Sequence, residues 1–156
     1  MWGISANVPV AMLAAMLLLA ATGDIRSRRI PNKLNLAIAV LAMPFWLLSG
    51  YALWPEIGVQ LALAAGVFLF FALLFQLGMM GGGDVKLLAA LALWLPLASL
   101  VKLVVIMSLA GGVLTLVMLV RHKAAKTDGR IEVPYGVAIA FAGMWVIGER
   151  FLYQFG

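Results

Sequence analysis

The sequence has no cysteine, a single histidine and only six acidic residues. Without cysteine there is no disulfide framework, iron–sulfur centre or cysteine-based zinc site, and one histidine does not supply a two-histidine metalloprotease motif. Charged residues make up 11% of the 156 residues, against roughly 25% in a soluble domain. The sequence has too few charged residues to cover the surface of a water-soluble globule. It therefore predicts an integral membrane protein with one domain over residues 1–156.

Long uncharged stretches predict an all-α fold with about six transmembrane helices, because a helix needs about 20 largely apolar residues to cross the ~30 Å hydrocarbon layer. The predicted spans are Met1 to Gly23, Leu34 to Pro55, Ile57 to Gly83, Leu87 to Val101, Leu103 to Val120 and Val133 to Gly148. The fourth is short and contains Pro96, so a partial crossing is the alternative there. The first has no basic residue before Asp24, which favours a membrane span over a cleaved signal peptide.

The basic residues predict the orientation, because cytoplasmic loops are rich in Lys and Arg. Two predicted loops are strongly basic and hold Arg26, Arg28, Arg29 and Lys33 after the first span and Arg121, Lys123, Lys126 and Arg130 after the fifth. Six spans with both of these loops in the cytoplasm place both termini outside. Lys102, between the fourth and fifth spans, is then a lone positive residue outside. We interpret the net charge of +5 as a topology signal and as contact with anionic lipid, not with nucleic acid.

Two of the acidic residues are candidates for catalysis. Asp24 ends the first apolar stretch, and Asp84 follows Gly81, Gly82 and Gly83. The predicted topology puts both carboxyl groups at one depth on the cytoplasmic side. Two facing carboxyl groups that share a proton hydrolyse a peptide bond when one activates water and the other polarises the carbonyl. The glycines predict an irregular segment that an extended substrate approaches closely.

Other interpretations of these residues stay open. Asp84 would also suit the cap of a helix that begins at Val85, and Asp24 would pair with Arg28 at the interface. A small proton- or cation-coupled transporter would use the two aspartates and Lys86 as a relay. A non-catalytic membrane subunit of a pilus or secretion machine would need the aspartates only as helix caps.

Three segments resemble the type IV prepilin peptidase family, membrane aspartyl proteases with a Gly-x-Gly-Asp motif. They are Asp24 to Asn32, Gly81 to Leu87 and Val133 to Ala138, in the family's order. The short form without a soluble insertion resembles the tight-adherence branch, which processes Flp-type pilins. The resemblance implies an enzyme of the bacterial inner membrane in which Asp24 and Asp84 are catalytic and the active site lies near the cytoplasmic face. General signal-peptide or presenilin-type proteolysis shares the dyad and differs in its substrate.

The resemblance also implies partners and further site residues. The substrate is expected to be a prepilin or pseudopilin precursor, cut between a short basic leader and its hydrophobic helix, with membrane lipid and the pilus assembly machinery as further partners. Lys86 is a candidate for substrate binding, or else an interface lysine. By analogy with other intramembrane aspartyl proteases, Pro134, Tyr135 and Gly136 border the active site.

Neither a metal nor another cofactor is expected from these residues. Long members of the family that resemble this chain's core also N-methylate the new pilin terminus, and they carry a cytoplasmic domain with paired cysteines. This sequence has no cysteine. We therefore expect proteolysis alone.

Overall fold

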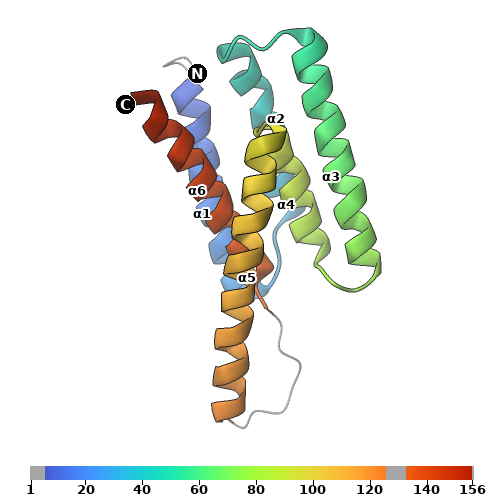
Figure 1. Ribbon diagram of the computed structural model, residues 1–156, viewed down its shortest axis with the longest axis vertical. Coiled ribbons are helices and arrows are strands. Elements are labelled where there is room, and N and C mark those ends of the chain that lie inside the picture. The colour runs from blue at the N-terminus through green and yellow to red at the C-terminus, as the bar shows by residue number, and fades with distance from the viewer. Residues whose placement is uncertain (1–5, 126–132, 156) are drawn as a thin grey trace.

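A computed structural model shows an all-helical bundle (Figure 1) and describes residues 6–125 and 133–155. The helices are α1 (Asn7–Ser27), α2 (Asn32–Leu48), α3 (Gly58–Gln76), α4 (Gly82–Ala92), α5 (Leu97–Ala125) and α6 (Tyr135–Phe155). A π-helical turn, η2 (Leu53–Ile57), leads into α3. The predicted all-α fold is confirmed.

Within the described residues, four helical stretches are long and apolar enough to cross a membrane: Asn7–Ser27, Leu53–Gln76, Leu97–Lys123 and Tyr135–Leu152. α2 is a shorter apolar helix of 17 residues, and α4 has 11 residues. At 1.5 Å per residue, α4 is about 16 Å long, roughly half the thickness of the hydrocarbon layer. The number of complete crossings and the side on which the termini lie stay predictions.

The break between the fourth and fifth predicted spans lies at Pro96 and not at Lys102. α4 ends at Ala92, a turn covers residues 93–96, and α5 begins at Leu97. Proline has no N–H group and suits the start of a helix, and the Pro96 carbonyl accepts the N–H of Leu100 at 3.0 Å. Lys102 therefore lies inside α5. It forms an ion pair with Glu149 of α6, which explains why this charge does not mark a loop.

The short helix α4 lies at the centre of the bundle and packs against α2, α3 and α6 (Figure 1). Most of its side chains are buried, and the less buried positions Lys86 and Ala89 lie on one side of the helix. α3, by contrast, buries only Gln60 and Phe71, so most of its surface is left to lipid.

Two tryptophans fix α2 to the far end of α4. The indole N–H of Trp46 donates to the Leu93 carbonyl at 2.9 Å, and that of Trp94 donates to the Ile38 carbonyl at 3.0 Å. The Trp94 ring also stacks on Phe45, with centroids 4.8 Å apart. These contacts bury aromatic surface while satisfying both N–H groups.

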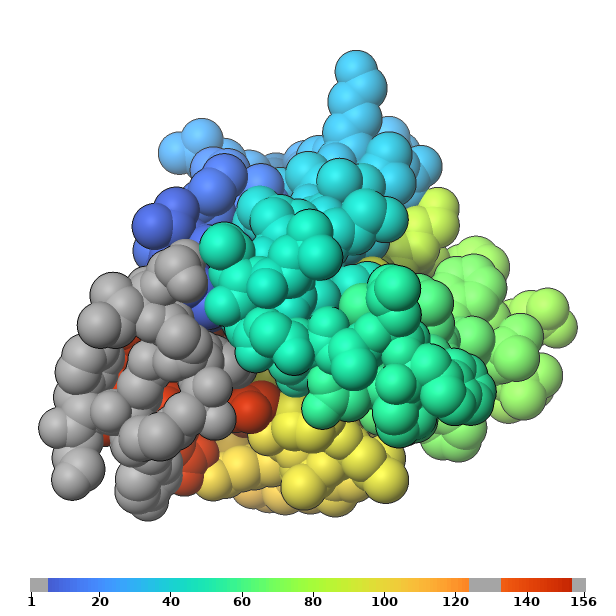
Figure 2. All heavy atoms as spheres, turned by 90° about the horizontal axis from the view of Figure 1, so that it is seen from above, coloured from blue at the N-terminus to red at the C-terminus, as the bar shows by residue number. Residues whose placement is uncertain are grey.

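The helix termini that carry the candidate site residues lie together at one end of the bundle. In Figure 1, α1 ends and α4 and α6 begin near the lower end, and the basic end of α5 extends beyond them. The ends of α1 and α5 that lead into the two predicted basic loops thus share one end of the bundle, while Lys126 and Arg130 lie outside the described residues. At the opposite end, Figure 2 shows the connection from α2 to α3 lying across the middle of the surface.

Replacing Gln60 with leucine is expected to lower the free energy of unfolding by about 2–3 kcal/mol. The Gln60 amide is buried and donates to the carbonyls of Ala92 at 2.5 Å and Leu95 at 2.6 Å. Gln60→Leu leaves both carbonyls unsatisfied at the turn between α4 and α5. Denaturant unfolding in detergent measures the loss. Gln76→Leu, an exposed position on the same helix, is the control, and an equal loss in both variants would contradict the assigned role.

Candidate active site

Asp24 lies in the last turn of α1, buried with 6% of its surface exposed. Its carbonyl accepts the N–H of Arg28 at 3.0 Å. Arg28 adopts the left-handed conformation, with φ of 52°, and ends the helix. A left-handed residue is a common helix terminator, although a non-glycine residue carries some strain in it. The turn brings the following loop back toward the Asp24 end of α1, where the Arg29 carbonyl lies close to Gly23.

The N-terminus of α6 lies directly against the Asp24 carboxyl group. A Cβ added at Gly136 would lie 2.8 Å from Oδ2 of Asp24, so only glycine fits there without displacement. The backbone N–H groups of Gly136 and Val137 interact with this carboxyl group, and the positive end of a helix attracts a negative charge. Oδ2 itself is buried and has no hydrogen-bond partner among the described residues. It is therefore an unpaired acceptor in the interior of the site.

Asp84 is the third residue of α4, and Gly81 is the N-cap. The N–H of Asp84 donates to the Gly81 carbonyl at 3.1 Å, and its carboxyl group reaches back to the Gly81 N–H. An acidic residue at this position is typical of a capping box. Asp84 thus does cap its helix, but α4 begins at Gly82 and not at Val85.

The two carboxyl groups are close enough to interact. Asp84 is buried and lies outside the four stretches long enough to cross a membrane. Burial first, and the negative charge of Asp24 second, raise the pKa of Asp84 to about 6, against a smaller opposing effect of the Gly81 N–H. Asp84 therefore keeps its proton at pH values where an ordinary aspartate is ionised.

Of the three glycines before Asp84, Gly81 is non-helical as predicted, whereas Gly82 and Gly83 do not form the predicted irregular segment. Gly82 and Gly83 belong to the first turn of α4, and neither has a positive φ. A Cβ at Gly83 would lie 3.3 Å from Cβ of Ile30, and one at Gly82 would lie 3.4 Å from the Phe75 ring. The contact at Gly83 is tight enough to favour glycine, whereas the spacing at Gly82 is an ordinary van der Waals contact, and the backbone of both residues is helical.

Ile30 is a site residue that the sequence interpretation missed. It is buried between the start of α4 and the start of α6, against Gly83 and Gly136. Gly83 directly precedes Asp84 in the sequence, and Gly136 lies against the Asp24 carboxyl group. Ile30 thereby sets the spacing between the two carboxyl-bearing segments. In the sequence it stands within the Asp24 to Asn32 segment that carries the family resemblance, but it was not selected as a site residue.

The predicted residues at the start of α6 do not share one role. Gly136 touches Asp24, whereas the Tyr135 ring lies against α5, where a Cβ at Gly111 would come within 2.9 Å of its Cε1 atom. Pro134 is buried, and its carbonyl accepts the N–H of Val137 at 3.1 Å. This hydrogen bond forms part of the first turn of α6, the helix whose N-terminus faces Asp24.

Lys86 lies away from the dyad. Two residues along a helix correspond to a rotation of about 200°, so Lys86 and Asp84 lie on opposite faces of α4. The Lys86 ammonium group donates to Oδ1 of Asn32 at 2.9 Å. Asn35, which the sequence interpretation did not single out, donates to the Gly83 carbonyl at 3.1 Å. Its one signal was that it lies three residues after Asn32 in an otherwise apolar helix.

The described residues include no cluster of three His, Cys, Asp or Glu side chains that could hold a metal ion. The site is instead a pair of buried carboxyl groups on α1 and α4, beside the N-terminus of α6. A protonated and an ionised carboxyl group together activate a water and polarise a carbonyl group. The geometry therefore suits acid–base hydrolysis.

Comparison with known proteins gives two matches. The profile of the type IV leader peptidase family matches residues 11–116, a range that includes Asp24 and Asp84. A prepilin leader peptidase/N-methyltransferase of Xanthomonas campestris pv. campestris is 32% identical in an alignment of 144 positions, and the alignment covers 88% of this chain and 48% of that protein. The chain thus spans about half the length of this relative. No solved structure gives a significant match.

Gly136→Ala is expected to lower the free energy of unfolding by about 1–3 kcal/mol, because the added methyl group overpacks the contact with Asp24. Gly148→Ala on the same helix is the matched control, since nothing lies within 4 Å of a Cβ there. That variant should be neutral or more stable, because alanine favours helix. Thermal unfolding in detergent compares the two, and equal stability would contradict the close contact.

The free energy of unfolding of Asp84→Asn, relative to that of the wild type, is expected to increase as the pH rises from about 4 to above 6. Because folding raises the pKa of Asp84, ionisation destabilises the folded state. That penalty is absent below the ordinary aspartate pKa, grows up to the raised value and is constant above it. Asparagine does not ionise. Unfolding measured at pH 4 and pH 8 tests the difference, and a stability gap that does not change with pH would count against the shifted pKa.

Proposed function

Because the chain belongs to the type IV leader peptidase family, we propose that it is an aspartic endopeptidase that removes the leader from prepilin precursors. The observation that carries the proposal is the pair of buried carboxyl groups, Asp24 at the end of α1 and Asp84 at the start of α4. The name of the Xanthomonas relative supports a prepilin as the substrate. The resemblance found in the sequence is thus confirmed for the family, while the tight-adherence branch stays a prediction.

In the proposed reaction, Asp84 enters protonated and Asp24 ionised. Asp24 takes a proton from a water molecule whose oxygen attacks the scissile carbonyl carbon, while Asp84 gives its proton to the carbonyl oxygen. The tetrahedral intermediate then collapses with cleavage of the C–N bond. Asp24 passes its proton to the leaving amine, and Asp84 recovers a proton from the hydroxyl group that becomes the new carboxyl group. Both aspartates therefore return to their starting states.

The surroundings of the two carboxyl groups support this division of roles. The raised pKa of Asp84 suits the acid. The Asp24 carboxyl group faces the N–H groups of Gly136 and Val137, which hold its orientation, and its Oδ2 has no partner among the described residues. A general base needs such an available oxygen within reach of the water.

We further propose that the precursors are Flp-type or related minor pilins with a short basic leader, cut just ahead of their hydrophobic helix. The reaction would take place near the cytoplasmic face of the inner membrane, and the pilus assembly machinery would receive the product. The candidate site lies at the same end of the bundle as the basic ends of α1 and α5, and basic segments favour the cytoplasmic side of a membrane. Proteolysis without N-methylation is part of the proposal and rests on the absence of cysteine in the sequence.

Asp24→Asn and Asp84→Asn are each expected to lower the rate of leader removal by about 10²–10⁴-fold, because each removes one proton-transfer group. Glu149→Gln, which changes an acid paired with Lys102 on α5, should cut at close to the wild-type rate. Candidate prepilins are co-expressed with each variant, and mass spectrometry of the membranes measures the fraction that has lost its leader. Immunoblots of the membrane fraction confirm that each variant is inserted.

Normal processing by either aspartate variant would exclude the dyad. Wild-type cleavage that stops on chelation would point to a metal mechanism instead. The product mass also shows whether the new terminus carries a methyl group, which would contradict proteolysis alone.

A further inference from the structure

A groove runs along the bundle between α2 and α3, on the face of α4 opposite to Asp84. Both helices pack on α4, yet they make few contacts with each other. Two adjoining cavities of about 520 and 450 Å³ occupy this space, and they share Ala39 and Leu93 in their linings. α2 borders them from Asn32 to Leu47, which corresponds to about 22 Å of helix. We call this space the α2–α3 groove.

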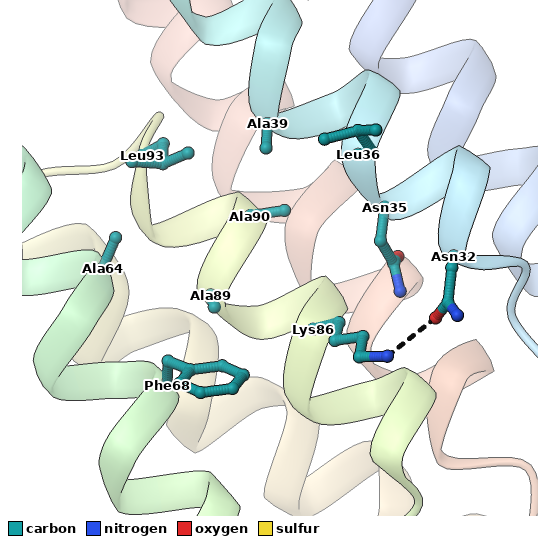
Figure 3. A pocket seen from close by; sticks show the side chains of 10 residues that line it. All are labelled: Asn32, Asn35, Leu36, Ala39, Ala64, Phe68, Lys86, Ala89, Ala90 and Leu93. Atoms are coloured by element: carbon teal, nitrogen blue, oxygen red, sulfur yellow. Dashed lines mark hydrogen bonds between the residues drawn. The ribbon is translucent and has the colours of Figure 1, made fainter.

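The groove is lined mainly by apolar side chains, and several of them are small. Figure 3 shows four alanines at its surface, one from α2, one from α3 and two from α4, namely Ala39, Ala64, Ala89 and Ala90. Small residues let the backbone of a second helix approach closely, which is how transmembrane helices pack. The length and lining of the groove therefore fit one apolar helix of about 15 residues.

The groove is polar at one end only. Lys86, Asn32 and Asn35 lie together there (Figure 3), and Leu93 lies toward the other end. Asn35 is 4% exposed, and its Oδ1 atom is buried without a hydrogen-bond partner among the described residues. Its Nδ2 atom already donates to Gly83, the residue before Asp84. The polar end thus adjoins the turn that carries the candidate acid and offers an unused acceptor.

We propose that the α2–α3 groove binds an apolar helix of the substrate, with the N-terminal end of that helix at Asn35 and Lys86. The first N–H groups of a helix have no partner within it, and one of them would donate to Oδ1 of Asn35. The Lys86 ammonium group, which uses one donor on Asn32, would bind a carbonyl or carboxylate oxygen of the same segment. The inference rests on the proposed peptidase function.

A peptide helix fits these groups better than a phospholipid does. A lipid phosphate only accepts hydrogen bonds, so it would pair with Lys86, and Oδ1 of Asn35 would still need a separate donor from the headgroup. A buried acceptor without a partner costs free energy. The first N–H groups of a helix supply a donor for Asn35, and the residues just before the helix supply an acceptor oxygen for Lys86. This arrangement also orients the substrate, because the bond to be cut then lies before the helix.

The substrate reaches the dyad by passing around the first turn of α4. A helix is about 10 Å across, and an extended chain advances about 3.3 Å per residue. Half of the way around such a helix is about 16 Å, so about five extended residues connect the groove to Asp84. The turn they pass contains Gly82 and Gly83, against which Phe75 and Ile30 pack, so the chain passes beside these two side chains.

The alanines of the groove provide a matched test. Ala64→Leu and Ala89→Leu fill the groove and are expected to raise KM about tenfold for a synthetic precursor with a basic leader and a 20-residue apolar helix. Ala65→Leu is the control, since Ala65 is the exposed neighbour on α3 that does not line the groove. A short peptide that contains the leader and cleavage site but no apolar helix should be cut equally by all three variants. Unchanged KM for the full precursor in both groove variants would overturn the proposal.

A second measurement does not depend on activity. The chain has no cysteine, so Ala64→Cys and Ala65→Cys are each labelled at a single thiol with benzophenone maleimide. In the Asp84→Asn background, illumination should crosslink the precursor to position 64 and not to position 65. Equal crosslinking at both positions would refute helix binding. Helix binding would also be refuted if Ala64→Leu displaces bound phospholipid while KM is unchanged. If the Ala64→Cys protein with Asp84 unchanged crosslinks the precursor but never cuts it, and the unlabelled wild type does not cut it either, the peptidase function is refuted and the groove assignment stays intact.

Discussion

The candidate site depends on the contact between the Asp24 carboxyl group and the bare start of α6. A carboxyl group loses its hydration on burial, and that cost has to be offset by N–H groups and by positive charge. The start of α6 supplies both, but only because Gly136 has no side chain. The contact fixes the end of α1 against the beginning of α6. Ile30, which lies in the same space, then sets the distance to α4.

The position of Asp84 follows from the short length of α4. The helix begins at the Gly81 cap, with Asp84 in its first turn, and stops after three turns. Its far end is fixed by side chains from two other helices, since Gln60 of α3 binds the carbonyls of the turn and Trp46 of α2 binds Leu93. Anchoring of that end leaves α4 little freedom to slide along its axis. The depth of Asp84 relative to Asp24 is therefore determined by contacts at the opposite end of the helix.

The sequence was sufficient to predict the helical fold and to select the two aspartates, because acids are so scarce that their positions carry information. It was insufficient where a residue's role depends on a distant partner. Lys102 suggested a loop, but it lies within α5 and forms an ion pair with Glu149 of α6. The glycines before Asp84 suggested an open backbone, whereas their neighbours are Ile30 and Phe75, which no local pattern reveals. Side chains such as Ile30 and Asn35 are ordinary in composition and become informative only through long-range contacts.

In the proposed enzyme, the two faces of α4 would separate substrate recognition from catalysis. Asp84 faces Asp24 on one side, and the α2–α3 groove, with Lys86 at its polar end, lies on the other. An occupant of the groove would bind through a segment that takes no part in bond cleavage, and binding energy from such remote contacts is what positions a reacting bond. The same arrangement requires the chain to leave helical geometry before it reaches the carboxyl groups. Because a scissile carbonyl inside a helix accepts an internal hydrogen bond, an extended passage around α4 would also expose that carbonyl to the acid.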